Sequence, residues 1–284
     1  MRWFARLVLI LLLAGCARPE PVNPALWELT GPQGERAWLF GTIHALPNRV
    51  EWRTAKVRQA LDRADLLVLE IAAIDQPDQI ARAFAELSHS PGLPPVADRL
   101  PPALRPTLMR VLAEEGLDPA ALTGLETWAV ALTIVSSSNE AGDSTNGIDR
   151  ALVADRPDLP RAELEGTQGQ LIIFDRLPEA DQRALLAATL QDDDSKGEEV
   201  RLIRAWSRGD MAAIERETHR GMLANPALRQ ALFVSRNQSW QMQIERMLRD
   251  GKHPFVAVGA AHFAGEDGLP AMLARRGWSV TRIE

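Results

Sequence analysis

The chain has 284 residues, a formal net charge of −6 and one cysteine. Its length suits one large domain or two small ones and is ample for a hydrophobic core. The acidic balance, with no basic block after the first residues, argues against nucleic acid as a partner. A single cysteine rules out an internal disulfide, so the fold has to be stable without covalent cross-links.

The N-terminus has the organisation of a bacterial lipoprotein signal. Arg2 and Arg6 are followed by the apolar run Leu7–Leu13, two small residues and then Cys16. This run is shorter than the roughly 20 apolar residues that a membrane-spanning helix needs, and it suits the apolar region of a cleaved signal peptide. We therefore expect residues 1–15 to be removed and Cys16 to be acylated, palmitate included. The alternative is an ordinary secretory signal in which the cysteine is incidental.

Processing at this cysteine predicts a location as well as an anchor. Cys16 is followed by Ala17 rather than by an aspartate, which in Gram-negative cells favours the outer membrane. We expect a lipoprotein of the cell envelope, held in the outer membrane by its lipid and facing the periplasm. Residues 16–25 are rich in proline and predict a short tether, and residues 26–284 predict the folded part.

The folded part begins and ends with strand patterns and is mainly helical in between. Short alternating or continuous apolar runs predict strands, and apolar residues spaced by three and four predict helices. In chain order we expect strands at 26–30 and 36–42, a helix at 52–64, a strand at 66–70 and several helices between about 76 and 138. We then expect helices at 148–154 and from 168, with a strand at 161–165 between them, and helices at 181–190, 198–207 and 226–248. The chain should end with a strand at 254–259, a helix at 269–275 and a strand at 278–283.

Strands that alternate with helices indicate an α/β fold with a central, largely parallel or mixed sheet between flanking helices. The helical stretch at about 76–138 predicts an insertion that forms a helix-rich cap on this domain.

Two of the five histidines have the same surroundings. His44 and His262 each follow an apolar strand pattern, a glycine (Gly41 and Gly259) and two further residues. In open α/β sheets, ligands bind just beyond the carboxyl ends of the strands, and a glycine there allows a sharp turn or a close approach. Both imidazoles are therefore candidate metal ligands or acid–base groups.

Glu70 is the first charged residue after the apolar run at 66–69, again at the end of a predicted strand. Two histidines and one carboxylate are a common ligand set for a catalytic divalent ion, and manganese, cobalt and zinc all suit it. The alternative is structural: each histidine would make an ordinary hydrogen bond, and Glu70 would begin a solvated loop. The other histidines lack this setting and are expected at the surface: His89, His219 and His253.

The sequence also resembles the TraB/GumN family, bacterial relatives of the Tiki proteins that cleave Wnt ligands. The resemblance extends from about Leu26 to Ile283. It is carried by residues 26–29, 38–44, 67–70, 147–149 and 163–165 with Gln168, by Arg236 and Asn237, and by residues 259–262 with Gly265, Gly268 and Leu269.

This resemblance implies a divalent-metal-dependent hydrolase and, more specifically, a peptidase. It also implies a fold related to that of the erythromycin esterases. It implies that His44, Glu70 and His262 form the centre. It also implies that Glu165 is a further ligand or the general base for water.

Three further residues are second-tier candidates through the same resemblance. Arg236 would hold a substrate carboxylate or stabilise an oxyanion, and Asn237 accompanies it. The alternative for this pair is an exposed patch on a long helix. For Asp149 the alternative is a carboxylate at a helix start that interacts with the helix dipole.

Three functions therefore stay open. The first is a metal-dependent hydrolase in the envelope that acts on a peptide bond. The second is a metal-independent hydrolase in which His44 with Glu70 or His262 forms an acid–base pair acting on an ester. The third is a lipoprotein that binds a peptide or polysaccharide component of the envelope without turnover.

Overall fold

A six-stranded mixed sheet forms the centre of the computed structural model, which describes residues 20–137, 143–191 and 195–284. The six strands are all predicted from the sequence, with ends that agree to within two residues. They are β2 (Leu26–Thr30), β3 (Arg36–Thr42), β5 (Leu66–Leu69), β6 (Arg161–Glu163), β7 (Pro254–Gly259) and β8 (Ser279–Arg282). Two further short strands, β1 (Glu20–Pro21) and β4 (Val50–Glu51), pair with each other.

The order of strands across the sheet is β6-β5-β7-β3-β2-β8. Strands β6, β5, β7 and β3 are parallel, and β2 runs antiparallel to both β3 and β8. Phe255 of β7 lies opposite Trp38 of β3 on one side and Leu67 of β5 on the other. The carboxyl ends of these strands therefore meet at one edge of the sheet, and the predicted α/β class with a mixed sheet is confirmed.

The inner strands are apolar on both faces, as continuous apolar runs predict. Successive residues of a strand point to opposite faces. In β3, Leu39 packs into the core on one face and Phe40 into the core on the other. In β7, Val256 packs on the same face as Leu39, and Phe255 packs on the same face as Phe40.

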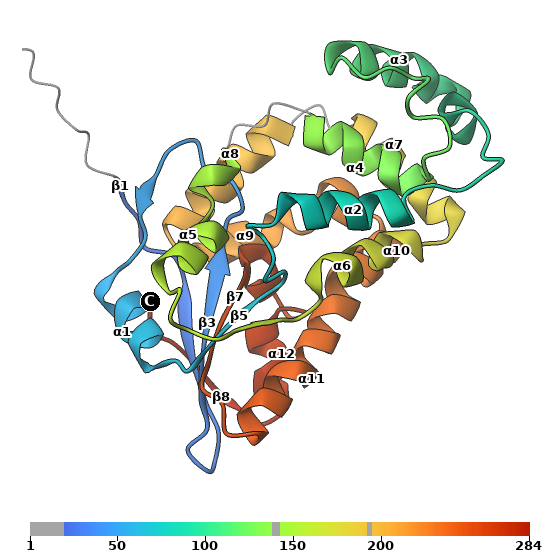
Figure 1. Cartoon of the computed structure of the whole chain (residues 1–284). Helices are drawn as coiled ribbons and strands as arrows, with labels where there is room; N and C mark the ends of the chain where they lie inside the picture. Colours follow the sequence, from blue (N-terminus) through green and yellow to red (C-terminus); the bar gives the residue numbers. More distant parts are fainter. Residues whose placement is uncertain (1–19, 138–142, 192–194) are drawn as a thin grey trace, which may run out of the picture.

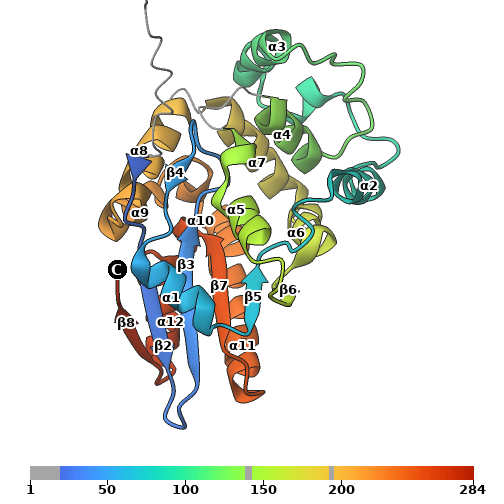
Figure 2. The same ribbon diagram turned by 60° about the vertical axis from the view of Figure 1, so that its left-hand side comes forward.

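Helices cover both faces of the sheet (Figure 2). Helices α1 (Ala55–Arg63) and α5 (Ile148–Asp155) pack on the face that carries Phe40. Helices α11 (Ser235–Arg249) and α12 (Leu269–Arg275) pack on the opposite face. This is a three-layer arrangement in which both helical layers bury apolar surface against the sheet.

The remaining large helices form a cap above the carboxyl end of the sheet (Figure 1). Between β5 and β6 lie α2 (Pro77–Leu87), α3 (Arg105–Glu114) and α4 (Thr127–Ser137), with the 3-10 turns Val96–Arg99 and Pro102–Leu104 between α2 and α3. Their core is shared with later helices, because Trp128 packs in one cluster with Leu185 and Leu228. These belong to α7 (Glu179–Gln191) and α10 (Pro226–Arg229), and α6 (Gly166–Asp175) also packs on the cluster. The boundaries of the insertion stay a prediction.

The helix predicted at 226–248 contains a break in its regular hydrogen bonding. It starts as predicted, with Asn225 accepting hydrogen bonds from the N–H groups of Ala227 and Leu228 and with Pro226 in the first turn. A π-helical turn at Gln230–Val234 then separates α10 from α11. Such turns change the direction of the side chains that follow and occur often at functional sites.

Two helices at 195–217 connect the cap to the sheet. These are α8 (Ser195–Ser207), predicted from 198, and α9 (Met211–Glu217), which was not predicted from the sequence. Short 3-10 turns at Ser144–Asn146, Gly221–Ala224 and Ala260–Phe263 complete the described elements.

The described part of the expected tether is attached to the domain. The N–H of Val22 donates to the carbonyl of Glu51 at 3.1 Å, and the N–H of Asn23 donates to that of Ser207 at 2.8 Å. Cys16 and the expected signal peptide lie outside the described residues. Among the described helices none is long and apolar enough to cross a membrane.

Candidate functional site

The sheet brings His44, Glu70 and His262 together at the carboxyl ends of β3, β5 and β7. A Cβ atom placed on Gly259 would lie 3.3 Å from Glu70 Oε1, 3.5 Å from His44 Nε2 and 3.8 Å from His262 Cδ2. All three predicted ligands therefore surround one point beside the Gly259 backbone. A side chain at this position would crowd the space that they share.

A buried carboxylate orients His44. Its Nδ1 lies 2.8 Å from Asp149 Oδ2, and the hydroxyl of Thr42 donates to Asp149 Oδ1 at 2.7 Å. Nδ1–H therefore donates to the carboxylate, and Nε2 faces the other two predicted ligands. The charge of the Asp149 carboxylate raises the pKa of His44 to about 9, and the hydrogen bond to Asp149 and the charge of Glu70 act in the same direction. The His44 side chain is 62% exposed, so its ring exchanges protons with solvent readily.

A neutral amide orients His262. Asn237 donates through Nδ2 to the carbonyl of Asp267 at 2.7 Å, so its Oδ1 is the atom that accepts from His262 Nδ1, also at 2.7 Å. The buried ring of His262 stacks on Phe233, with centroids 5.3 Å apart, and lies 4.4 Å from the ring of Trp240. Burial lowers the pKa of His262 to about 3. The imidazole is therefore neutral, with its lone pair on Nε2.

Both oxygens of Glu70 have partners. Oε1 accepts from the backbone N–H of Gly259 at 2.8 Å, and Oε2 accepts from Arg236 at 2.7 Å and from Gln170 at 3.3 Å. Burial would raise the pKa of Glu70, but the positive charges of His44 and Arg236 and the Gly259 hydrogen bond outweigh it and hold this pKa well below its usual range. Glu70 is therefore a carboxylate.

Arg236 connects Glu70 to Glu165. Its Nε donates to Glu165 Oε1 at 2.8 Å and its Nη2 to Oε2 at 2.9 Å, the two-pronged geometry that suits a guanidinium. Trp240 donates from its indole nitrogen to Glu165 Oε1 at 3.0 Å, and its ring lies 4.7 Å from the Arg236 guanidinium carbon. The Arg236 side chain is 13% exposed and Asn237 is fully buried, so the alternative of an exposed patch is wrong for both.

Two glycines allow the backbone segments at the site to approach one another. A Cβ on Gly41 would lie 2.9 Å from the Cα of Ala260, so the end of β3 can touch the turn after β7 only without a side chain there. A Cβ on Gly147 would overlap the carbonyl oxygen of His44. Because Gly147 is bare, α5 starts directly against the loop after β3, which places Asp149 beside His44.

Four residues of the site were not predicted: Thr42, Gln170, Phe233 and Trp240. The sequence holds a signal for two of them, because Phe233, Arg236, Asn237 and Trp240 are spaced by three, one and three residues and share one helix face. The three other histidines, His89, His219 and His253, are exposed as predicted.

These residues line a cavity of about 490 Å³, which we call the inner cavity. Its polar lining includes His44, Glu70, Gln170, Arg236 and His262, and its apolar lining includes side chains of α4, α6 and α8. This volume falls within the ~300–1,000 Å³ that is typical of ligand sites. The cavity offers a protonated imidazole (His44), a neutral imidazole (His262), a carboxylate and a guanidinium to one bound molecule.

The donor set at the inner cavity fits a divalent metal ion. His44 and His262 each present Nε2 while an acceptor holds Nδ1, which is the usual arrangement of metal-ligating histidines. As arranged, no three His, Cys, Asp or Glu side chains among residues 20–137, 143–191 and 195–284 are close enough to hold an ion. The Arg236 guanidinium contacts Glu70 and lies 3.3 Å from His262 Nε2. An ion bound by His44, Glu70 and His262 would therefore contact a carboxylate that also accepts a hydrogen bond from Arg236.

Comparison with known proteins agrees with the resemblance seen in the sequence. The profile of the TraB/PrgY/gumN family matches residues 25–282. Two curated relatives, both described as uncharacterized protein YbaP, come from Shigella flexneri and from Escherichia coli strain K12. Each is 26% identical over 256 residues, which cover 88% of this chain and 92% of the relative. No solved structure gives a significant match. The chain belongs to the TraB/PrgY/gumN family.

Proposed function

We propose that the protein is a divalent-metal-dependent hydrolase that cleaves a peptide bond in the inner cavity. The observation that supports this most directly is the pair of imidazoles at the ends of β3 and β7. Each has Nδ1 bound to a buried acceptor and presents Nε2 beside the Glu70 carboxylate. Two imidazole nitrogens and a carboxylate around one point form a ligand set for a catalytic ion, which would displace the proton from His44 Nε2 on binding.

His44, Glu70 and His262 would hold the ion, and manganese, cobalt and zinc all suit this set. When bound, the ion would supply activation of water and polarisation of the scissile carbonyl.

The other residues of the site would orient these side chains and stabilise negative charge on the substrate. Arg236 keeps a positive charge between two carboxylates and can stabilise negative charge that develops on a substrate oxygen. Glu165 has both oxygens bound to Arg236 and one also to Trp240, so we assign it the positioning of Arg236 rather than the role of general base. Asp149 and Asn237 orient the two imidazoles.

The substrate and the location in this proposal come from the sequence. The peptide bond follows from the resemblance to the Tiki-related family, and the envelope location follows from the lipid expected on Cys16. On this basis the enzyme would be anchored in the outer membrane and act on a peptide of the periplasm. Incorporation of labelled palmitate into the parent but not into a Cys16→Ser variant would support the anchor.

A second candidate is a metal-independent hydrolase that acts on an ester. It is favoured by the position of Arg236, whose guanidinium already lies against Glu70 and His262. It is also favoured by the His44–Asp149 pair, because a carboxylate on Nδ1 supports proton transfer at Nε2. In this mechanism His44 would exchange a proton with water or with the leaving group.

The deciding experiment is metal content measured together with hydrolysis. The full chain in mild detergent is loaded with manganese, cobalt or zinc, desalted and analysed by mass spectrometry, beside His44→Ala and His262→Ala variants. His253→Ala is the matched control, because His253 is exposed, precedes the first residue of β7 and does not line the inner cavity. We expect about one retained ion in the parent and the control, loss in both site variants, and peptide hydrolysis that a chelator abolishes.

The other outcomes separate the alternatives. Hydrolysis of an ester that continues in the presence of chelator, with no retained ion, would contradict the metal-dependent proposal and support the second candidate. Ligand binding without hydrolysis of any peptide or ester would leave the non-catalytic lipoprotein as the remaining function.

A further inference from the structure

A second cavity of about 710 Å³, which we call the outer cavity, adjoins the inner one. The side chains that line both cavities include Phe174, Leu202, Leu232, Arg236 and His262. Three of these are apolar, and the other two belong to the site described above. A molecule held by Arg236 and His262 can therefore extend into the outer cavity past an apolar boundary. The volume of the outer cavity again falls within the range that is typical of ligand sites.

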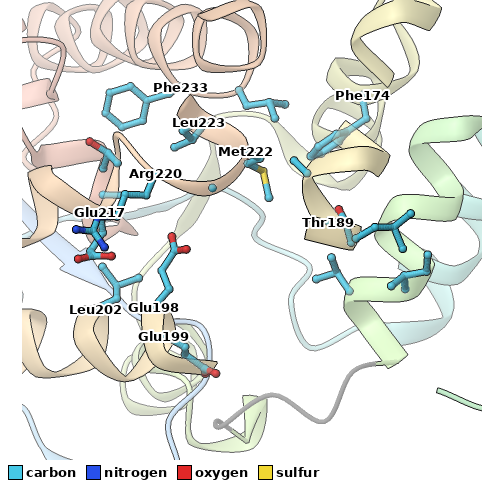
Figure 3. Close-up of a pocket in the computed structure, with 18 of the residues that line it drawn as sticks. Phe174, Thr189, Glu198, Glu199, Leu202, Glu217, Arg220, Met222, Leu223 and Phe233 are labelled. Carbon is cyan, nitrogen blue, oxygen red and sulfur yellow. The ribbon is translucent and has the colours of Figure 1, made fainter. Parts of the chain in front are cut away.

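The walls of the outer cavity are rich in apolar side chains (Figure 3). The cap contributes Ile134 of α4 and Phe174 of α6, and the turn before α10 contributes Met222 and Leu223. Met222 is 38% exposed, and large apolar side chains that stay open beside a cavity are typical of surfaces that bind a ligand. The flexible thioether of methionine also adapts to ligand groups of different shape.

Phe233 connects this apolar wall to the reacting groups. It lines the outer cavity and belongs to the π-helical turn at Gln230–Val234. Its ring stacks on the imidazole of His262, with centroids 5.3 Å apart. A group that packs against Phe233 in the outer cavity therefore lies one ring away from His262, close to the place where we expect the substrate to be cleaved.

Most of the charged side chains around the outer cavity already interact within the protein. Arg110 pairs with Glu114 at 2.8 Å, and Arg201 pairs with Glu217 of the lining at 3.4 Å. Two further lining residues also have partners within the chain: Glu198 and Glu199. We therefore expect the apolar wall, rather than charge, to select what binds in this cavity.

We propose that the outer cavity is a specificity subsite that binds a large apolar side chain of the polypeptide substrate, such as leucine, methionine or phenylalanine, close to the bond that is cleaved. The inference rests on the proposed peptide hydrolysis for the nature of the substrate. Burial of a leucine or phenylalanine removes more apolar surface from water than burial of an alanine, so it contributes more binding free energy. A charged side chain would lose its hydration there, because the charges nearby are already paired.

The test measures binding rather than turnover. Fluorescently labelled peptides of equal length, with blocked ends and a single variable residue among polar, uncharged ones, are titrated with the full chain in mild detergent and chelator. The variable residue is phenylalanine, leucine, alanine, lysine or glutamate, and a titration without protein gives the detergent baseline. We expect the phenylalanine and leucine peptides to bind about tenfold more tightly than the alanine peptide. The lysine and glutamate peptides should bind no more tightly than the alanine peptide.

The ionic strength separates apolar binding from charge. Burial of apolar surface is not screened by salt, whereas attraction between exposed charges is. The preference for phenylalanine and leucine should therefore be the same at low and at high ionic strength.

Matched variants assign the preference to the outer cavity. Ala188→Phe fills the cavity from α7 and should remove the preference, whereas Ala180→Phe on the same helix is exposed, lines neither cavity and should keep it. Met222→Asn should weaken binding of the phenylalanine peptide about threefold. Its control is Met242→Asn, because Met242 is 61% exposed and lines neither cavity. Circular dichroism of each variant confirms that the fold survives.

Equal binding of the phenylalanine, leucine and alanine peptides, or a preference that survives Ala188→Phe, would overturn the inference. So would a lysine or glutamate peptide that binds as tightly as the phenylalanine peptide. Its failure differs from failure of the proposed function. A parent that prefers the apolar peptides but hydrolyses nothing supports the subsite and contradicts the hydrolase. Hydrolysis at the same rate for every variable residue does the opposite.

Discussion

The two Gly-x-x-His segments have the same sequence pattern and opposite surroundings. His44 donates to a carboxylate, is open to solvent and has its pKa raised to about 9. His262 contacts a neutral amide, lies between two aromatic rings and has its pKa lowered to about 3. The pattern therefore places an imidazole at a strand end, whereas the partner and the burial decide its charge.

The site therefore consists of a buried half and an open half, which we expect to have different roles. The buried half, which contains His262, Arg236, Glu70 and Glu165, is a network in which nearly every polar atom has a partner. The open half, which contains His44 and Asp149, can exchange protons and ligands. We expect substitutions in the buried half to affect stability most, and those in the open half to affect reactivity.

The largest effect is expected for Arg236→Met. It leaves two buried carboxylates, Glu70 and Glu165, without their shared cation, and breaking such a network typically costs about 3–5 kcal/mol. The free energy of unfolding, measured by urea denaturation, should fall by this amount. The control is Arg246→Met on the same helix, whose side chain is 82% exposed and which should change stability by less than about 0.5 kcal/mol. A similar small change for Arg236→Met would show that the network does not form.

The next effect compares the two histidines directly. His262→Ala removes a buried ring that packs on Phe233 and Trp240 and leaves Asn237 without its partner, so we expect a loss of about 2–4 kcal/mol. His44→Ala removes a largely exposed ring and should lower stability by less than about 1 kcal/mol. Thermal and urea unfolding measure both losses. Equal losses would contradict the division into a buried and an open half.

The third prediction concerns Asp149→Asn, which sharpens the comparison by giving His44 a neutral acceptor like that of His262. In metal-free protein the pKa of His44 should fall from about 9 toward its ordinary value of 6.5, because the Asp149 charge is the main cause of the shift. NMR titration of the imidazole resonances measures this change.

The sign of the linked effect on stability follows from the raised pKa. In the parent, the His44–Asp149 interaction stabilises the folded state fully below about pH 6.5, and this contribution is lost as the pH rises through about 9. The stability of the parent and that of the variant should therefore converge at alkaline pH. A gap between them that stays constant over the whole range would show that the His44 charge is not linked to Asp149.

Much of the fold could be predicted because its signals are local. The period-two and continuous apolar patterns of the strands, and the Asn225–Pro226 start of the long helix, depend on neighbouring residues. The π-helical turn at Gln230–Val234 could not be predicted, because apolar spacing does not distinguish it from a regular helix. Helix α9 could not be predicted, since its 7 residues make only about two turns, too few to show a helical repeat of apolar positions.

By itself the sequence determined which residues stand at the ends of the strands. Parallel strands bring their carboxyl ends to one edge, so His44, Glu70, His262 and Glu165 all lie along that edge once the sheet has formed. Only the tertiary structure decided the partners of these side chains. Arg236 is 166 residues from Glu70 and 71 from Glu165 along the chain, and such pairs leave no local pattern. The charge of each imidazole was decided at the same stage, because it depends on burial and on a neighbour that folding alone brings into contact.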